Sequence, residues 1–178
     1  TRLTGQKGIE LIQQAAGDIL ATGAFFIALG SGEKQYETFL QRLRDHAPRQ
    51  VGAYVGYSEP LAHQIEAGAD IFLMPSRFEP CGLNQMYSLR YGTIPVVRAV
   101  GGLDDTVENF DAVTGRGNGF KFGPFRADRF VERIYEALFA YADPATREVI
   151  RRNGMSIDNS WENAARKYVD LYSLTLSI

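Results

Sequence analysis

The sequence contains almost no cysteine or histidine. Cys81 is the only cysteine among 178 residues, and His46 and His63 are the only histidines. A single cysteine excludes an internal disulfide, and these three side chains are too few for a zinc site made of cysteine and histidine. We therefore expect neither a disulfide-stapled fold nor a bound metal ion.

The sequence also has no excess of charge and no long apolar run. Lys and Arg number 19 against 21 Asp and Glu, which gives a net charge of −2. This balance leaves no excess of basic residues, so we expect no nucleic-acid or membrane partner. It is compatible with a small cationic cluster around a phosphate. No run approaches the ~20 apolar residues of a membrane span, and residues 1–7 do not resemble a signal peptide. A cytoplasmic setting is the expectation.

The remaining composition is that of a globular domain, with 45% hydrophobic and 22% charged residues. Apolar runs predict strands over 24–29, which should be buried on both faces, 51–55, 71–74 and, more weakly because of Pro95, 94–97. Amphipathic stretches between them predict helices over 8–22, 33–45, 59–67 and 82–92. This alternation predicts an α/β fold, a Rossmann-like parallel sheet with helices on both faces, and a ligand at the carboxyl ends of the strands.

The second half changes character. Six of the 23 residues in 101–123 are glycine, which predicts a loop with a short edge strand near 119–122. Helices should resume after Pro124, and Ser160 is a good N-cap for a last helix. That helix has an aromatic stripe, which we expect another surface to cover: Trp161, Ala165, Tyr168, Tyr172 and Leu176.

Two cations flank a glycine-containing turn at the start of the chain. Arg2 and Lys7 lie on either side of Gly5, just before the helix predicted over 8–22. The free amides and positive dipole end of a helix N-terminus could hold a diphosphate together with these cations. The alternative is a solvated cationic turn.

A carboxylate follows the predicted strand 71–74 in the segment Ser-Arg-Phe-Glu-Pro-Cys-Gly-Leu. Glu79 would then lie at the carboxyl end of a strand, where it could contact a sugar. Gly82 would allow the amides of Gly82 and Leu83 to face a phosphate. The alternative is an acidic residue that merely stabilises a helix N-terminus.

Further candidates follow other predicted strands. Gly30 and Ser31 belong to a Gly-Ser-Gly segment that could be a tight turn or a ligand contact. Tyr57 could stack on a nucleobase or serve as a packing residue. His63 is expected to be a hydrogen-bonded structural residue, and Cys81 a packing or contact residue.

Together these segments resemble one family. The matching runs are 2–8, Gly56-Tyr57, 75–83, 91–98 and 101–107, and they are similar to the bacterial glycogen synthase and plant starch synthase family. The resemblance covers nearly the whole chain. The Ser-Arg-Phe-Glu-Pro-Cys-Gly-Leu block is highly specific, whereas the glycines alone would not be.

The resemblance implies a glucosyltransferase that needs no metal and no cofactor. Such enzymes transfer glucose from ADP-glucose, or UDP-glucose in some members, to an α-1,4-glucan, and they retain the anomeric configuration. They have two Rossmann-like domains, an arrangement called GT-B. Residues 1–178 would form the C-terminal donor-nucleotide domain, with C-terminal helices over 126–178, and the acceptor domain would lie outside this chain. A plant source would imply the plastid.

The resemblance also implies roles for individual residues. Arg2 and Lys7 would bind the donor diphosphate, Tyr57 would stack on the base, and Glu79 would contact the transferring glucose. The rest of the donor pocket would comprise Gly30, Ser31, Cys81, Gly82, Leu83 and Asn84.

Two positions depart from the broader pattern. Tyr87 stands where related retaining transferases carry a second glutamate. Asn84 stands where threonine or another small or apolar residue is expected in many relatives. Another retaining GT-B glucosyltransferase is one alternative, which the Cys81 segment disfavours. A non-catalytic nucleotide-binding or regulatory module is the other, and the sequence leaves it open.

Overall fold

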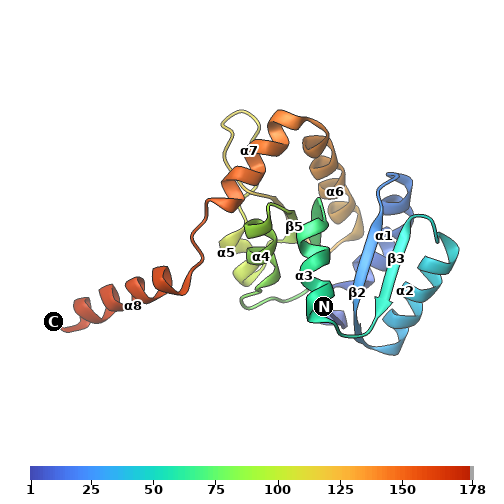
Figure 1. Ribbon diagram of the computed structural model, residues 1–178, viewed down its shortest axis with the longest axis horizontal. Coiled ribbons are helices and arrows are strands. Elements are labelled where there is room, and N and C mark those ends of the chain that lie inside the picture. The colour runs from blue at the N-terminus through green and yellow to red at the C-terminus, as the bar shows by residue number, and fades with distance from the viewer. Residues whose placement is uncertain (177–178) are drawn as a thin grey trace.

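The computed structural model describes residues 1–176 and has an α/β architecture with parallel strands (Figure 1). In this part of the chain, β1 (Arg2–Leu3), β2 (Phe26–Gly32) and β3 (Val51–Val55) form one three-stranded sheet. A second sheet contains β4 (Ile71–Met74), β5 (Ile94–Arg98) and β6 (Phe120–Phe122). Neighbouring strands pair in parallel in both sheets, which confirms the predicted fold class.

Helices separate the strands and cover the sheets. Helix α2 packs on β2 and β3, α6 packs on β5 and β6, and both α4 and α5 contact β5. A short 3₁₀ turn, Gly5–Lys7, precedes α1. The helices are α1 (Ile9–Ala21), α2 (Lys34–His46), α3 (Glu59–Gly68), α4 (Asn84–Tyr91), α5 (Gly101–Thr106), α6 (Ala127–Ala142), α7 (Pro144–Met155) and α8 (Trp161–Leu176).

Strand β5 is buried on both faces. Ile94 and Val96 belong to the core that includes Phe130 of α6, whereas Val97 packs with Leu103 of α5. Pro95 does not end this strand. The amide of Ile94 donates to Asp70 O, on the side of β4. Successive amides of a strand point to opposite sides, so an amide at position 95 would point toward β6. The pairing with β6 begins only at Val96. No donor is therefore missing at Pro95.

Strand β2 runs further than the sequence predicts, because it includes Gly30 and Gly32. The chain of β1 lies directly against these glycines. A Cβ atom on Gly30 would be 2.3 Å from the carbonyl oxygen of Thr1, and one on Gly32 would be 2.4 Å from that of Leu3. The Gly-Ser-Gly segment is thus the end of a strand and not a tight turn.

An apolar groove of about 390 Å³ separates β2 from β4, and it is lined by residues 24–29 and 71–73 among others. The prediction that the first apolar run is buried on both faces is wrong for the described structure, since Phe25 is 79% and Ile27 58% exposed. The two sheets are joined instead by packing of α1 against α6.

Two further elements differ from expectation. Helix α5 lies within the segment 101–123 that we predicted as a loop, although β6 appears where the edge strand was expected. Helix α8 projects away from the body of the molecule (Figure 1), and none of its described side chains is buried. Its predicted cap is present, because the amide of Asn163 donates to Ser160 Oγ at 3.2 Å.

Candidate functional site

The 3₁₀ turn and the start of α1 place Lys7 beside the segment that follows β4. Gly8, between the two, adopts a left-handed φ of 71°. A Cβ atom there would lie 1.9 Å from the carbonyl oxygen of Pro75. Only glycine allows this close approach, so Gly8 brings Lys7 against the loop that carries Glu79.

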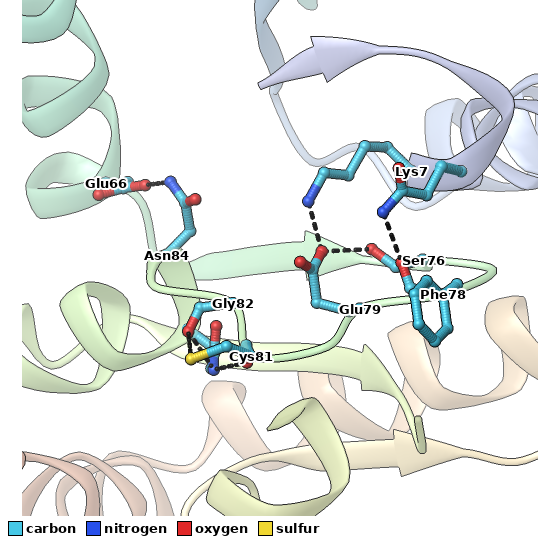
Figure 2. Close-up of polar contacts among 10 residues, drawn as sticks. Lys7, Glu66, Ser76, Phe78, Glu79, Cys81, Gly82 and Asn84 are labelled. Atoms are coloured by element: carbon cyan, nitrogen blue, oxygen red, sulfur yellow. Dashed lines mark hydrogen bonds and ion pairs between the residues drawn. The ribbon is translucent and has the colours of Figure 1, made fainter. Parts of the chain in front are cut away.

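Glu79 is the centre of a small polar cluster. Its side chain is buried, and its Oε2 atom pairs with Lys7 Nζ and accepts a hydrogen bond of 3.2 Å from Ser76 Oγ. Figure 2 shows both donors pointing at the carboxylate. Lys7 and Glu79 are 72 positions apart, so the fold unites two separately predicted site residues.

The loop before Glu79 is held by its neighbours at the backbone. The amide of Arg77 donates to Gln6 O at 2.8 Å, and Gln6 Nε2 donates to Phe78 O at 3.2 Å. The guanidinium of Arg98 donates to the carbonyl oxygens of Arg77 at 2.7 Å and Ser76 at 3.4 Å. Burial, and then the nearby charge of Arg77, lower the pKa of the Arg98 guanidinium. The position of Glu79 is therefore fixed by several elements.

The turn that leads into α4 contains the other predicted donor-pocket residues. Cys81 and Leu83 are exposed, and Gly82 has a left-handed φ of 74°. The Asn84 side chain donates to the carboxylate of Glu66, which is only 3% exposed (Figure 2). This turn therefore presents its backbone at the surface next to Glu79.

Arg2, Ser31 and Gly30 come together at the end of the first sheet. Arg2 pairs in register with Ser31, and both side chains are exposed. Tyr57 follows β3 and is 82% exposed. Within residues 1–176, no hydrogen bond or ion pair links Arg2 or Tyr57 to Glu79. The predicted site thus forms two groups, both at carboxyl ends of parallel strands.

Neither a metal cluster nor a membrane span is present in the described part of the chain. No group of three or more His, Cys, Asp or Glu side chains is arranged to hold a metal ion there. No helix among residues 1–176 is both long and apolar enough to cross a bilayer.

Comparison with known proteins decides the family. Residues 1–156 match the family described as glycosyl transferases group 1. The chain belongs to this family. It is 49% identical over 172 residues to a glycogen synthase of Koribacter versatilis, and 46% identical to one of Bacillus cereus. Each alignment covers 97% of this chain but 36% of the relative, so the chain spans about a third of their length.

Solved structures agree with this assignment. The catalytic domain of Starch Synthase IV from Arabidopsis thaliana, bound to ADP and acarbose, matches with a TM-score of 0.87 and 37% identity, over 100% of this chain and 38% of that one. Sucrose-phosphate synthase from Thermosynechococcus elongatus matches with a TM-score of 0.73 at 22% identity, over 99% of this chain and 44% of that one, which shows the shared fold. The family resemblance found in the sequence is confirmed.

Sequence reasoning missed three residues that shape the site. Glu66 is a buried acid within a helix, Gln85 is a fully buried amide, and Arg98 is a partly buried cation at the end of β5. A polar residue in a segment with apolar neighbours can indicate a buried polar contact. The sequence does not identify that contact here, because the partners lie in other elements. His63 forms the hydrogen bond expected of it, because its Nδ1 atom lies 3.3 Å from the Tyr91 hydroxyl.

Proposed function

We propose that this chain is the donor-nucleotide-binding domain of a retaining α-glucan synthase. It would bind ADP-glucose or UDP-glucose, and the synthase would add the glucose to an α-1,4-glucan. The observation that carries the proposal is the buried Glu79, paired with Lys7 at the carboxyl ends of parallel strands. The glycogen synthases among the relatives, and the starch synthase structure bound to ADP and acarbose, support the substrate class.

The first task of such a site is to stabilise the departing nucleoside diphosphate. Negative charge grows on the phosphate oxygens as the bond to glucose breaks. Lys7, Arg2 and the free amides at the start of α4 would balance that charge, and preorganised groups of this kind act without reorganisation during the reaction. Because fixed cations serve here, the proposal requires no metal ion.

The second task is to stabilise the sugar. Glucose becomes oxocarbenium-like as the diphosphate leaves, and a nearby carboxylate favours that state. Glu79 is suited to this role because Lys7 and Ser76 hold its carboxylate in one orientation. The exposed ring of Tyr57 would stack on the base, and Gly30 and Ser31 would line the same pocket.

The acceptor is assigned to the rest of a longer protein. The chain covers 36% of the glycogen synthases it matches, and the groups described above all concern the donor. The glucan would bind in a cleft between this domain and a second one, which closes over the donor.

Calorimetric titration of ADP and of UDP into the full-length protein, with and without a chelator, tests the proposal. We expect saturable binding of at least one nucleotide that the chelator does not change. Transfer of labelled glucose from the matching nucleotide sugar to maltooligosaccharide should accompany it. Binding without transfer would support the regulatory-module alternative, and absence of binding would reject the donor site altogether.

A further inference from the structure

Gln85 is a polar side chain with no access to solvent, located in the first turn of α4. Its Nε2 atom donates to the carbonyl oxygens of Cys81 and Gly82, each at 3.0 Å, and lies 3.1 Å from Thr106 Oγ1. Three acceptors surround this one atom. The amide can therefore take only the orientation that puts nitrogen there, because the flipped form would set oxygen against oxygen.

The two carbonyl contacts fix two successive peptide planes. In a planar trans peptide the C=O and the N–H point in opposite directions. The Cys81 carbonyl belongs to the same peptide as the amide of Gly82, and the Gly82 carbonyl to the same peptide as the amide of Leu83. Because Gln85 draws both carbonyls inward, both amides are turned away from it.

Backbone geometry strengthens this arrangement. Gly82 has a left-handed φ of 74°, and Leu83 follows in the right-handed region with φ −112° and ψ −34°. Successive residues of opposite hand turn their amides to one side, which forms an anion-binding concavity. Within residues 1–176, neither the Gly82 nor the Leu83 amide has an acceptor.

Gln85 also anchors the turn to α5. Thr106 Oγ1 donates to Gly102 O at 2.5 Å, and the amide of Gly102 lies 3.2 Å from the carbonyl oxygens of both Glu79 and Pro80. The segment 79–82 is therefore held between α4 and α5. A Cβ atom on Gly82 would lie 2.5 Å from Gln85 Oε1, so the Gln85 amide packs directly against the Gly82 backbone.

We propose that Gln85 is a positioning residue that aims the amides of Gly82 and Leu83 at the donor phosphate. The inference rests on the proposed function, because it takes a nucleoside diphosphate as the ligand. It predicts a specific loss: without the Nε2 donor, the two peptide planes can rotate, and contacts to phosphate weaken while contacts to the nucleoside remain.

The test compares ADP with adenosine in the full-length protein. Gln85→Met keeps the length of the side chain but removes the donor. We expect its dissociation constant for ADP to rise about tenfold, the scale of losing one or two charge-assisted contacts, while that for adenosine changes less than twofold. The matched control is Gln64→Met on the exposed surface of α3, which should leave both constants unchanged.

The outcomes separate the inference from the proposed function. If the wild-type protein binds neither ADP nor UDP, the proposed function fails. If it binds UDP alone, the same comparison is made with UDP and uridine. If wild type binds ADP and folded Gln85→Met binds it equally well, or loses adenosine to the same degree, only the positioning role is overturned.

A second measurement needs no variant. We expect the amide proton signals of Gly82 and Leu83 in the wild-type protein to move downfield when ADP is added and to stay in place with adenosine. Unchanged signals at saturating ADP would overturn the inference even if Gln85→Met could not be folded.

Discussion

At the scale of single residues, the Lys7–Glu79 pair joins the two charges that the proposed reaction needs. The donor presents a negative diphosphate beside a sugar that becomes positive, so the site needs a cation and a carboxylate next to each other. The side chains of Lys7 and Glu79 are 18% and 8% exposed, which limits the water that would otherwise screen them. Their proximity suits a site where the bond between sugar and phosphate breaks.

Glu79→Gln should separate catalysis from binding. The amide keeps the shape of the side chain but removes the charge that favours an oxocarbenium-like sugar. We expect kcat for glucan elongation to fall by about 10²-fold, the scale of losing one preorganised electrostatic group, with the dissociation constant for ADP nearly unchanged. Steady-state kinetics and calorimetry on folded full-length protein would check this. A near-normal kcat would reject the assignment of Glu79.

Lys7→Ala should weaken ADP binding and also slow turnover, because the diphosphate is charged in both the donor and the leaving group. We expect the dissociation constant for ADP to rise about ten- to a hundredfold, together with a lower kcat. The substitution also leaves Glu79 buried without its cation, which should lower stability.

The double variant Lys7→Ala/Glu79→Gln is the control for that loss of stability. It removes both charges, so urea denaturation should show part of the stability regained, whereas ADP affinity should stay low. Recovery of ADP affinity in the double variant would show that Lys7 acts only through folding.

At the scale of elements, the site depends on how α1 begins. The 3₁₀ turn, Gly8 and the first turn of α1 meet the end of β4 at the Pro75 carbonyl. This contact sets the distance between the first sheet, which carries Arg2 and Ser31, and the loop that carries Glu79.

Gly8→Ala and Gly23→Ala test that contact at the two ends of the same helix. Both glycines have a left-handed φ, 71° and 78°, but a Cβ atom on Gly23 would meet nothing within 4 Å. Gly23→Ala should therefore cost only the backbone penalty, about 1 kcal/mol. Gly8→Ala adds a clash with backbone and should cost about 3 kcal/mol or more. Urea denaturation of both variants measures the difference, and equal costs would contradict the close packing at Gly8.

The elements predicted from sequence were those whose patterns are local. The strands at 51–55 and 71–74 have the predicted bounds. Each end of α2 and α3 lies within one residue of its predicted position. Helix α5 was missed because Gly101 and Gly102 favour a loop in isolation. They are needed because Cβ atoms there would meet the carbonyl oxygens of Glu79 and Cys81, at 2.2 and 2.0 Å. No local pattern encodes such a contact.

The sequence predicts individual residues of the site but not the contacts between them. Motifs identified Lys7 and Glu79 separately, but their ion pair depends on the crossing of two chain segments. The sequence gives Gln85 no role because a glutamine in a helix is ordinarily a surface residue, and its burial follows from the packing of α4 against the rest of the domain. The Asn84–Glu66 contact likewise requires α3 and α4 to lie side by side.

At the scale of the molecule, the polar donor groups and the aromatic stripe of α8 lie on different parts of the described surface. The donor groups lie at the carboxyl ends of the strands, whereas α8 projects from the body of the molecule (Figure 1). Its side chains Trp161, Tyr168 and Tyr172 are exposed. The expectation that another surface covers this stripe stays a prediction. The proposed acceptor cleft requires a second domain, so donor binding and transfer should be separable properties.

That separation can be measured with the 178-residue chain itself. Lys7, Glu79 and the turn at Gly82 are formed within the described residues, so we expect the purified chain to bind ADP. It should not elongate glucan, since closure over the donor and contacts to the acceptor need the second domain. Calorimetry with ADP, beside incorporation of labelled glucose into glycogen, checks both halves of the prediction, and the full-length protein serves as the positive control. Incorporation by the short chain at a rate like that of the full-length protein would show that residues 1–178 hold an acceptor site of their own, and it would overturn the assignment of this chain to the donor half alone.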